Sequence, residues 1–294
     1  MRNLSAKYSQ GQALLIILLI MAVALTIGLS LVSRSITDIK ISQQTEESAR
    51  AFSAAEAGIE SALVGEALEW TFSETGAGYV ASATEVGAGS EFAFPQAVDR
   101  EEIQTLWLAN NDDLNEVYNR GSLRVVWGNS GTILDSNAPA LEISLYYKDE
   151  SAVIPYRVAK FALDPYSGRS PDPAFCNPGE GSPQCDGVSS FSTAGELVGG
   201  KGFQYGAALN IASFTGSGKT ALFARLRLLY STSSHLLGAK ADGAGTSLLP
   251  TQGIKIESTG TVGTTTRKVE VVRFHPAPPS ILDFVLYSSG GLSK

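Results

Sequence analysis

The sequence predicts an α+β protein: a long N-terminal transmembrane-to-amphipathic helix packed against a β-rich C-terminal globular domain. Three observations lead to this prediction. Residues 13–32 are almost continuously apolar, and residues 34–68 favour a helix with one apolar stripe. The later part of the chain consists of short β-branched and aromatic runs between glycine-rich turns.

Charge is distributed unevenly along the chain. The formal net charge is −7, yet Arg2 and Lys7 are the only charged residues among the first 33, so the remainder is more acidic than the total. An acidic surface repels phosphate backbones, and we therefore expect no nucleic-acid partner. Because only two histidines are present, a His-rich metal site is excluded. We expect no metal and no cofactor.

The first predicted element is a membrane-spanning helix at residues 12–33. No charged residue occurs from Tyr8 to Ser33, and a helix over the apolar run spans ~30 Å, the thickness of a bilayer core. Arg2 and Lys7 precede this helix without an acidic neighbour. We therefore expect a single-pass membrane protein in contact with lipid, with its N-terminus in the cytoplasm and its head outside.

A cleavable secretory signal is the alternative interpretation of this segment. Ala22-Val23-Ala24 has the small-x-small pattern that signal peptidase recognises. However, residues 25–32 continue the apolar run without the polar region that normally precedes a cleavage site. The pattern favours a retained helix.

Residues 34–68 are predicted to continue the helix as an amphipathic half. They contain no proline, and apolar side chains recur at three- and four-residue steps. A stalk that only separates a domain from the membrane would not need such a one-sided stripe. We expect the stripe to contact the head through Phe52, Ala55, Ile59 and Leu63.

The β-rich part is expected to begin gradually. Residues 69–120 are predicted to form a linker and the start of the head, irregular up to residue 100 and followed by a short helix or strand. The head proper is assigned to residues 121–294. Strands are expected at residues 122–127, 141–147, 153–163, 203–214, 220–230, 254–262, 267–274 and, as a last edge strand, 281–287.

A polar loop insert at about residues 164–200 carries both cysteines of the chain, Cys176 and Cys185. In an outward-facing domain, a disulfide that closes this small loop is the first expectation. Asp164, Asp172 and Asp186 flank the loop, and calcium binding there stays open, although their spacing matches no EF-hand.

The catalytic and nucleotide-binding motifs that we tested are absent or incomplete. Gly216-Ser-Gly-Lys-Thr220 resembles the end of a phosphate-binding loop, but Ser213 replaces the first glycine and a strand is expected next. A hairpin turn explains these residues better. No serine-hydrolase or zinc-protease pattern occurs, and His235 and His275 stand alone, so we expect no enzymatic activity.

Two segments resemble a known family. Gly11-Gln-Ala-Leu-Leu-Ile16 with its apolar helix, and Ala51-Phe-Ser-Ala-Ala-Glu-Ala-Gly-Ile-Glu60, resemble the amino-terminal segment of type IV pilin-like proteins. The similarity is greatest to the minor pilins known as PilX and extends to the large pseudopilin of type II secretion. It covers roughly the first sixty residues, and the β-rich remainder only in general character.

The resemblance implies a pilin-like fold and a processing pathway. Residues 1–11 would be a basic leader that a prepilin peptidase removes after Gly11, and Gln12 would become the N-methylated first residue. The partners implied are other pilin subunits and the inner-membrane pilus assembly machinery. The helix surface implied in assembly comprises Leu14, Leu15, Ile16, Leu18 and Leu19.

Two positions depart from the family pattern. Gln12 stands where the family has phenylalanine, and Ile16 stands where it has a glutamate thought to neutralise the charged amine of a neighbouring subunit. A repeating subunit without that carboxylate would leave a buried amine unpaired at every interface. A subunit present once, with nothing above it, would not.

The sequence therefore predicts a minor pilin or pseudopilin that takes part in assembly, initiation or tip capping of a type IV pilus or related secretion filament. It would be a membrane protein first and then part of a cell-surface filament. The alternative is a non-polymerising, single-pass membrane-anchored extracellular binding protein. Whether the filament is a pilus or a secretion pseudopilus stays open.

Overall fold

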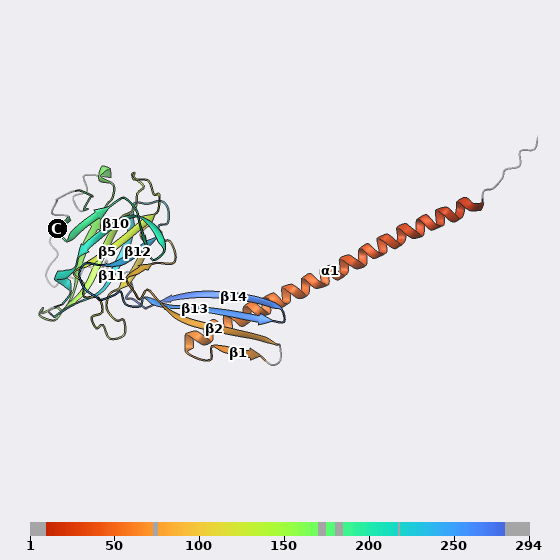
Figure 1. The fold of residues 1–294 in the computed structure, drawn as a ribbon, viewed down its shortest axis with the longest axis horizontal. Helices are drawn as coiled ribbons and strands as arrows, with labels where there is room; N and C mark the ends of the chain where they lie inside the picture. The colour runs from red at the N-terminus through yellow and green to blue at the C-terminus, as the bar shows by residue number, and fades with distance from the viewer. Residues whose placement is uncertain (1–9, 73–75, 170–174, 180–184, 217, 280–294) are drawn as a thin grey trace, which may run out of the picture. The chain divides into compact units, whose positions relative to one another are not determined.

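The computed structural model of the protein describes residues 10–72, 76–169, 175–179, 185–216 and 218–279, with side chains from residue 14 onward (Figure 1). The described chain contains one long helix, short 3-10 helices and many strands. The helices are α1 (Gln10–Val64), η1 (Ser167–Arg169) and η3 (Ala212–Phe214). The strands are β1 (Glu69–Phe72), β2 (Ala77–Val86), β3 (Glu91–Ala93), β4 (Ile103–Trp107), β5 (Ser122–Asn129), β6 (Ala140–Asp149), β7 (Tyr156–Leu163), β8 (Val188–Ser192), β9 (Glu196–Val198), β10 (Lys201–Asn210), β11 (Lys219–Leu229), β12 (Leu237–Asp242), β13 (Gly253–Val262) and β14 (Thr265–Phe274).

The chain divides into two compact units. The first, called the helix unit here, comprises Met1–Ala83 and Ile256–Val271. The second, called the sandwich unit, comprises Thr84–Lys255 and Val272–Lys294. The coarse prediction of one long N-terminal apolar helix followed by a β-rich region is confirmed.

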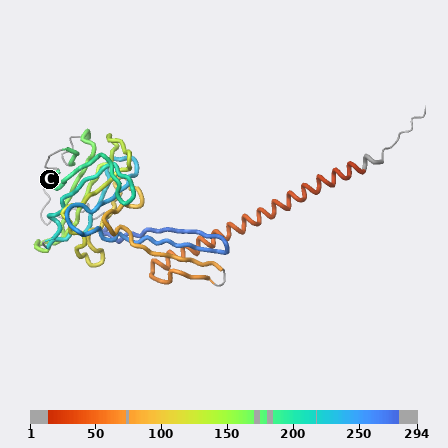
Figure 2. The backbone as a smooth tube through the Cα atoms, in the orientation of Figure 1, coloured from red at the N-terminus to blue at the C-terminus, as the bar shows by residue number. Residues whose placement is uncertain are grey.

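Helix α1 has 55 residues, which corresponds to a rod on the order of 80 Å long (Figure 2). It ends at Val64 rather than at the predicted residue 68. The reason is Gly65, which adopts a left-handed backbone with φ +81° and lets the N–H of Glu66 donate to the carbonyl of Ser61 at 2.9 Å. This arrangement terminates many helices, because it satisfies carbonyls that the helix itself leaves open.

A four-stranded sheet in the order β1-β2-β13-β14 lies along the C-terminal part of α1 (Figure 1). The prediction of an irregular segment at residues 69–100 is wrong, since that stretch contains β1, β2 and β3. Strand β2 buries Ala77, Tyr79 and Ala81 in alternation. Small residues are weak strand signals, and here they are needed because a helix covers this face of the sheet.

The sandwich unit contains two sheets. One has the order β3-β12-β5-β10-β8, with β9 also paired to β10, and the other has the order β4-β11-β6-β7. Alternate side chains of both sheets form one apolar core. Its largest fully buried members include Trp127, Tyr205, Leu106, Ile143 and Leu145.

Most expected strands of the head are present with bounds shifted by a few residues: β5, β6, β7, β10, β11, β13 and β14. Strands β8, β9 and β12 were not expected. The sequence of β12 is poor in β-branched residues, and its place between β3 and β5 supplies the hydrogen bonds that make it a strand. The predicted edge strand at 281–287 lies outside the described residues.

Candidate functional site

The first part of α1 is an uncovered apolar rod. Every described residue from 14 to 46 is exposed. The predicted assembly residues Leu14, Leu15, Ile16, Leu18 and Leu19 have exposed fractions between 53% and 68%. Among the described residues, α1 is the one helix long and apolar enough to cross a membrane. A surface that is apolar on all sides is unfavourable in water and suits a bilayer or neighbouring helices.

The predicted cleavage position lies at the start of this rod. Gly11 and Gln12 fall in the first turn of α1, which begins at Gln10, ahead of the described side chains. Ile16 follows one turn later and is 53% exposed. No carboxylate is present on α1 before Asp38.

The last part of α1 is held against the sheet of the helix unit. Its buried face consists of small residues and one larger anchor: Ala51, Ala54, Ala55, Gly58 and Ile59. Ala51 and Ala54 form one apolar cluster with Ala77 of β2 and Val262 of β13. The small side chains allow the helix backbone to approach the strands closely.

Two glycines show how closely the helix and the strands approach each other. A Cβ atom on Gly260 of β13 would lie 2.0 Å from the Ala51 carbonyl oxygen and 2.5 Å from the Ala55 nitrogen. A Cβ atom on Gly58 of α1 would lie 2.2 Å from Ser258 Oγ and 2.7 Å from the ring of Tyr79. Neither position has room for a side chain, so helix and sheet are in backbone contact at Gly260.

The predicted contact residues are only partly correct. Ala55 and Ile59 are buried, with exposed fractions of 0% and 7%, and Leu63 is half-buried. Phe52 was wrongly assigned, because its side chain is 46% exposed. The helix turns its alanines toward the sheet, because small side chains allow the helix backbone to approach the strands closely. The bulky ring of Phe52 does not belong to this buried face.

Polar contacts extend the junction toward the N-terminal, apolar part of α1. Thr265 Oγ1 donates a hydrogen bond to Glu47 Oε2 at 3.0 Å, and Arg267 Nε donates to Ser48 Oγ at 2.8 Å. Both donors come from β14, directly after the two-residue turn from β13. Among the described side chains of α1, Glu47 is thus the first with a hydrogen bond to the sheet.

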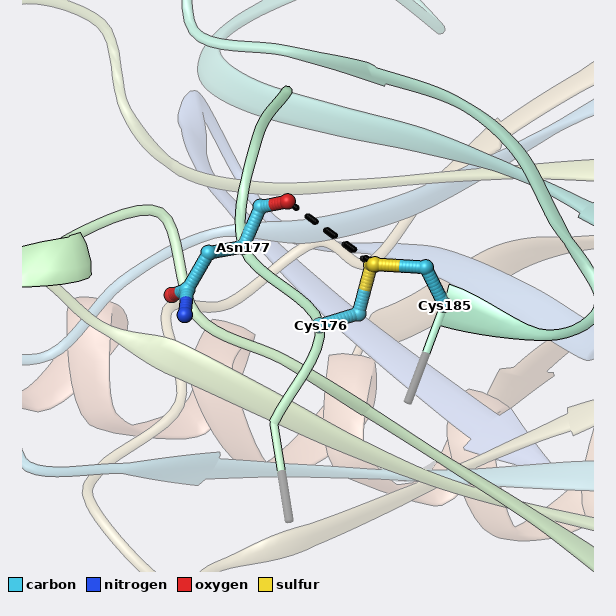
Figure 3. Close-up of a disulfide and its surroundings, with 3 residues drawn as sticks. All are labelled: Cys176, Asn177 and Cys185. Atoms are coloured by element: carbon cyan, nitrogen blue, oxygen red, sulfur yellow. Dashed lines mark hydrogen bonds between the residues drawn. A yellow bond between two sulfur atoms is a disulfide. The ribbon is translucent and has the colours of Figure 1, made fainter. Parts of the chain in front are cut away.

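The predicted disulfide between Cys176 and Cys185 is present in the sandwich unit (Figure 3). The carbonyl oxygen of Asn177 lies 3.9 Å and 3.8 Å from the two sulfur atoms. Cys176 is buried, and its backbone N–H donates to Ala162 of β7 at 2.8 Å. The backbone of Cys176 thus attaches the insert to the edge strand β7, and the disulfide closes a loop within the insert.

The acidic residues near this insert do not assemble into a metal site within the described part of the chain. Asp164 accepts two hydrogen bonds from Arg169, each of 2.7 Å, and its carboxylate is thereby neutralised. Asp172 lies outside the described residues. The described carboxylates therefore offer no support for the calcium possibility.

Sequence reasoning did not identify a buried serine–histidine contact. Ser231 Oγ lies 2.8 Å from His235 Nε2, and both residues are buried. The backbone N–H of Asn129 points to His235 Nδ1 at 3.3 Å, which places the ring proton on Nε2. His235 then donates to Ser231 and is not a base toward it. Burial lowers the pKa of His235, which keeps the ring neutral.

The phosphate-loop fragment also has a structural role. The N–H of Lys219 donates to the carbonyl of Gly216 at 3.0 Å, and β11 begins at Lys219. The predicted turn followed by a strand is present, but the prediction of a hairpin is wrong, because β10 and β11 belong to different sheets and do not pair with each other. Phosphate binding by this motif requires a helix after the threonine, and this chain has strand β11 there.

Comparisons of this chain with known protein families, with curated proteins and with solved structures found no match.

Proposed function

We propose that this chain is a minor pilin or pseudopilin subunit that takes part in assembly, initiation or tip capping of a type IV pilus or related secretion filament. The observation that carries the proposal is the contrast within α1. Residues 14–46 are uncovered, and most of the first twenty are apolar, whereas residues 47–63 are held against a sheet. Such a helix can leave a bilayer and pack laterally with similar helices while its head stays folded.

The proposed pathway begins in the membrane. The basic residues before α1 favour a cytoplasmic N-terminus and an outward-facing head. A prepilin peptidase would cleave after Gly11, and Gln12 would be N-methylated. The assembly machinery would then move the helix from lipid into contact with other pilin subunits. The proposal includes no catalytic step by this chain.

The position within the filament is inferred from Ile16. Cleavage after Gly11 would create a charged amine at Gln12, and a charged group in an apolar filament core needs a partner. Ile16 supplies none to a neighbouring subunit. A chain used once, at the tip or at initiation, avoids repeating this unfavourable contact along the filament.

The alternative function is a permanently anchored binding protein that never polymerises. A cavity of about 320 Å³ in the sandwich unit favours it, since a binding protein requires a ligand site. The membrane helix and the sheet junction would then serve only as an anchor.

Mass spectrometry of the mature N-terminus distinguishes these functions. Methylated Gln12 supports the filament subunit, intact Met1 supports the permanent anchor, and Leu25 would indicate a secreted soluble domain. The last two outcomes contradict the proposal.

Immunolabelling of filaments tests the inferred position. We expect sparse label or label at filament ends, and Ile16→Glu should spread the protein along filaments. Ile17→Glu is the matched control. Ile17 is as exposed as Ile16, at 53%, but it is not the residue that stands in place of the family's glutamate. Uniform decoration by the unmodified protein would exclude a tip or initiating role.

A further inference from the structure

The sandwich unit has a cavity over the sheet β4-β11-β6-β7. Its volume is about 320 Å³, and residues of all four strands line it. They include Trp107 of β4, Phe223 and Arg225 of β11, Tyr146 of β6 and Arg157 of β7. Neither the proposed filament role nor the core of the sandwich uses this cavity.

An aromatic row crosses three strands at this cavity. Trp107 pairs with Phe223 across β4 and β11, and Phe223 pairs with Tyr146 across β11 and β6. The rings of Tyr146 and Phe223 stack with centroids 4.6 Å apart, and Trp107 lies 5.2 Å from Phe223. Their strand neighbours Leu106 and Ala224 point into the core. The row therefore occupies the opposite face of the sheet.

The polar groups around the row are hydrogen-bond donors. The indole N–H of Trp107 is buried and has no acceptor among the described residues. Arg225 is 3% exposed, lies over the rings of Tyr146 and Phe223 at 5.4 Å and 5.6 Å, and donates to the carbonyl of Pro278. Arg157 is exposed at the cavity, and its charge also acts on the nearby carboxylate of Asp149, which does not line the cavity.

The sign of the charge at this cavity is opposite to that of the whole chain. Two arginines line it, and none of its described lining residues is aspartate or glutamate, although the chain carries a net charge of −7. The cationic side chains at the cavity favour a ligand that carries an anionic acceptor. Aromatic walls favour a planar apolar body.

We propose that this cavity binds a small carboxylate with a planar, apolar body. The body would lie against Tyr146 and Phe223, and the carboxylate would accept hydrogen bonds from Arg157 at the β7 edge of the cavity. The volume is at the lower end of the range of about 300–1,000 Å³ that holds small ligands, which favours a small molecule over a polypeptide segment.

Calorimetry of the full chain in lipid nanodiscs tests the proposal, with empty nanodiscs as the blank. The probes are 3-phenylpropionate and its neutral analogue 3-phenylpropanol. Arg157→Gln should weaken binding of the carboxylate about tenfold and leave the alcohol unchanged, because a charge-assisted hydrogen bond is lost. Lys160→Gln is the control, since it removes a cation from the same strand outside the cavity lining.

A second variant is a further control. Trp107→Phe retains a ring and removes only an N–H that protein atoms cover, so binding of 3-phenylpropionate should stay unchanged. The proposal is overturned if neither probe binds, or if both bind equally and Arg157→Gln affects neither. It is also overturned if only a chain ending at Pro279 binds, because the last residues of the chain would then occupy the cavity. These results do not depend on processing at Gly11 or on filament formation.

Discussion

The two parts of α1 belong to one uninterrupted helix but are built for different surroundings. Residues 14–32 present leucine, isoleucine and valine on all sides, and each of these side chains is at least half exposed. Residues 47–63 present alanine and glycine on one face, and the sheet covers that face completely at Ala51 and Ala55. Large apolar side chains suit a fluid lipid or helix environment, whereas small ones suit a fixed backbone contact.

The difference shows which part of this helix depends on particular residues at particular positions. The first part needs only enough apolar surface, so many substitutions among large apolar residues should be tolerated there. The second part needs particular small residues at particular positions, because strands lie within contact distance of its backbone.

The largest effect is expected from Gly260→Ala. The new Cβ would overlap backbone atoms of Ala51 and Ala55, which cannot move without shifting the helix. We expect the junction to lose about 3 kcal/mol or more. Hydrogen exchange of residues 47–63 in the full chain measures this loss. Gly28→Ala is the control, because a Cβ there would meet no described atom within 4 Å; equal protection in both variants would refute the close contact.

An intermediate effect is expected from Ile59→Ala. Ile59 is 7% exposed, and its truncation should destabilise the junction by about 2–3 kcal/mol. Phe52→Ala removes a larger side chain from the same helix but should cost under about 1 kcal/mol, because the ring is 46% exposed. Exchange rates of the same helix amides compare the two. A larger effect of Phe52→Ala than of Ile59→Ala would show that Phe52 belongs to the face of α1 that packs on the sheet, as the sequence predicted.

The smallest effect is expected from Thr265→Val. It removes the hydrogen bond to Glu47 while retaining the size of the side chain, and should cost about 1 kcal/mol. The loss should appear mainly as faster exchange near Glu47. Thr266→Val alters the next residue, which is exposed, and should leave exchange unchanged. Matching results for the two variants would show that Glu47 is not held by this contact.

Local patterns identified several parts of the protein correctly. The long apolar run predicted α1, runs of β-branched residues predicted β5, β6 and β11, and two cysteines in one short loop predicted their disulfide. These features depend on neighbours in sequence. The end of α1 at Gly65 was also visible in principle, because glycine at that position commonly ends a helix.

Contacts between distant segments account for what was missed. Strand β2 was taken for a linker because its alanines and glycine carry little strand signal, and β1 is only four residues long. The orientation of α1 was misjudged at Phe52, since size and hydrophobicity favoured the ring while the sheet accepts only alanine and glycine. The cavity joins residues of β4, β6, β7 and β11, which no spacing along the chain brings together.

By itself, the sequence determined a membrane-length helix, its amphipathic continuation and a β-rich head, because periodicity and apolar length are local properties. The tertiary structure alone decided which face of α1 meets the sheet and where Trp107, Tyr146, Phe223 and Arg157 converge. The physical reason is that these outcomes depend on how closely two backbones approach, and on pairing between strands far apart in the chain.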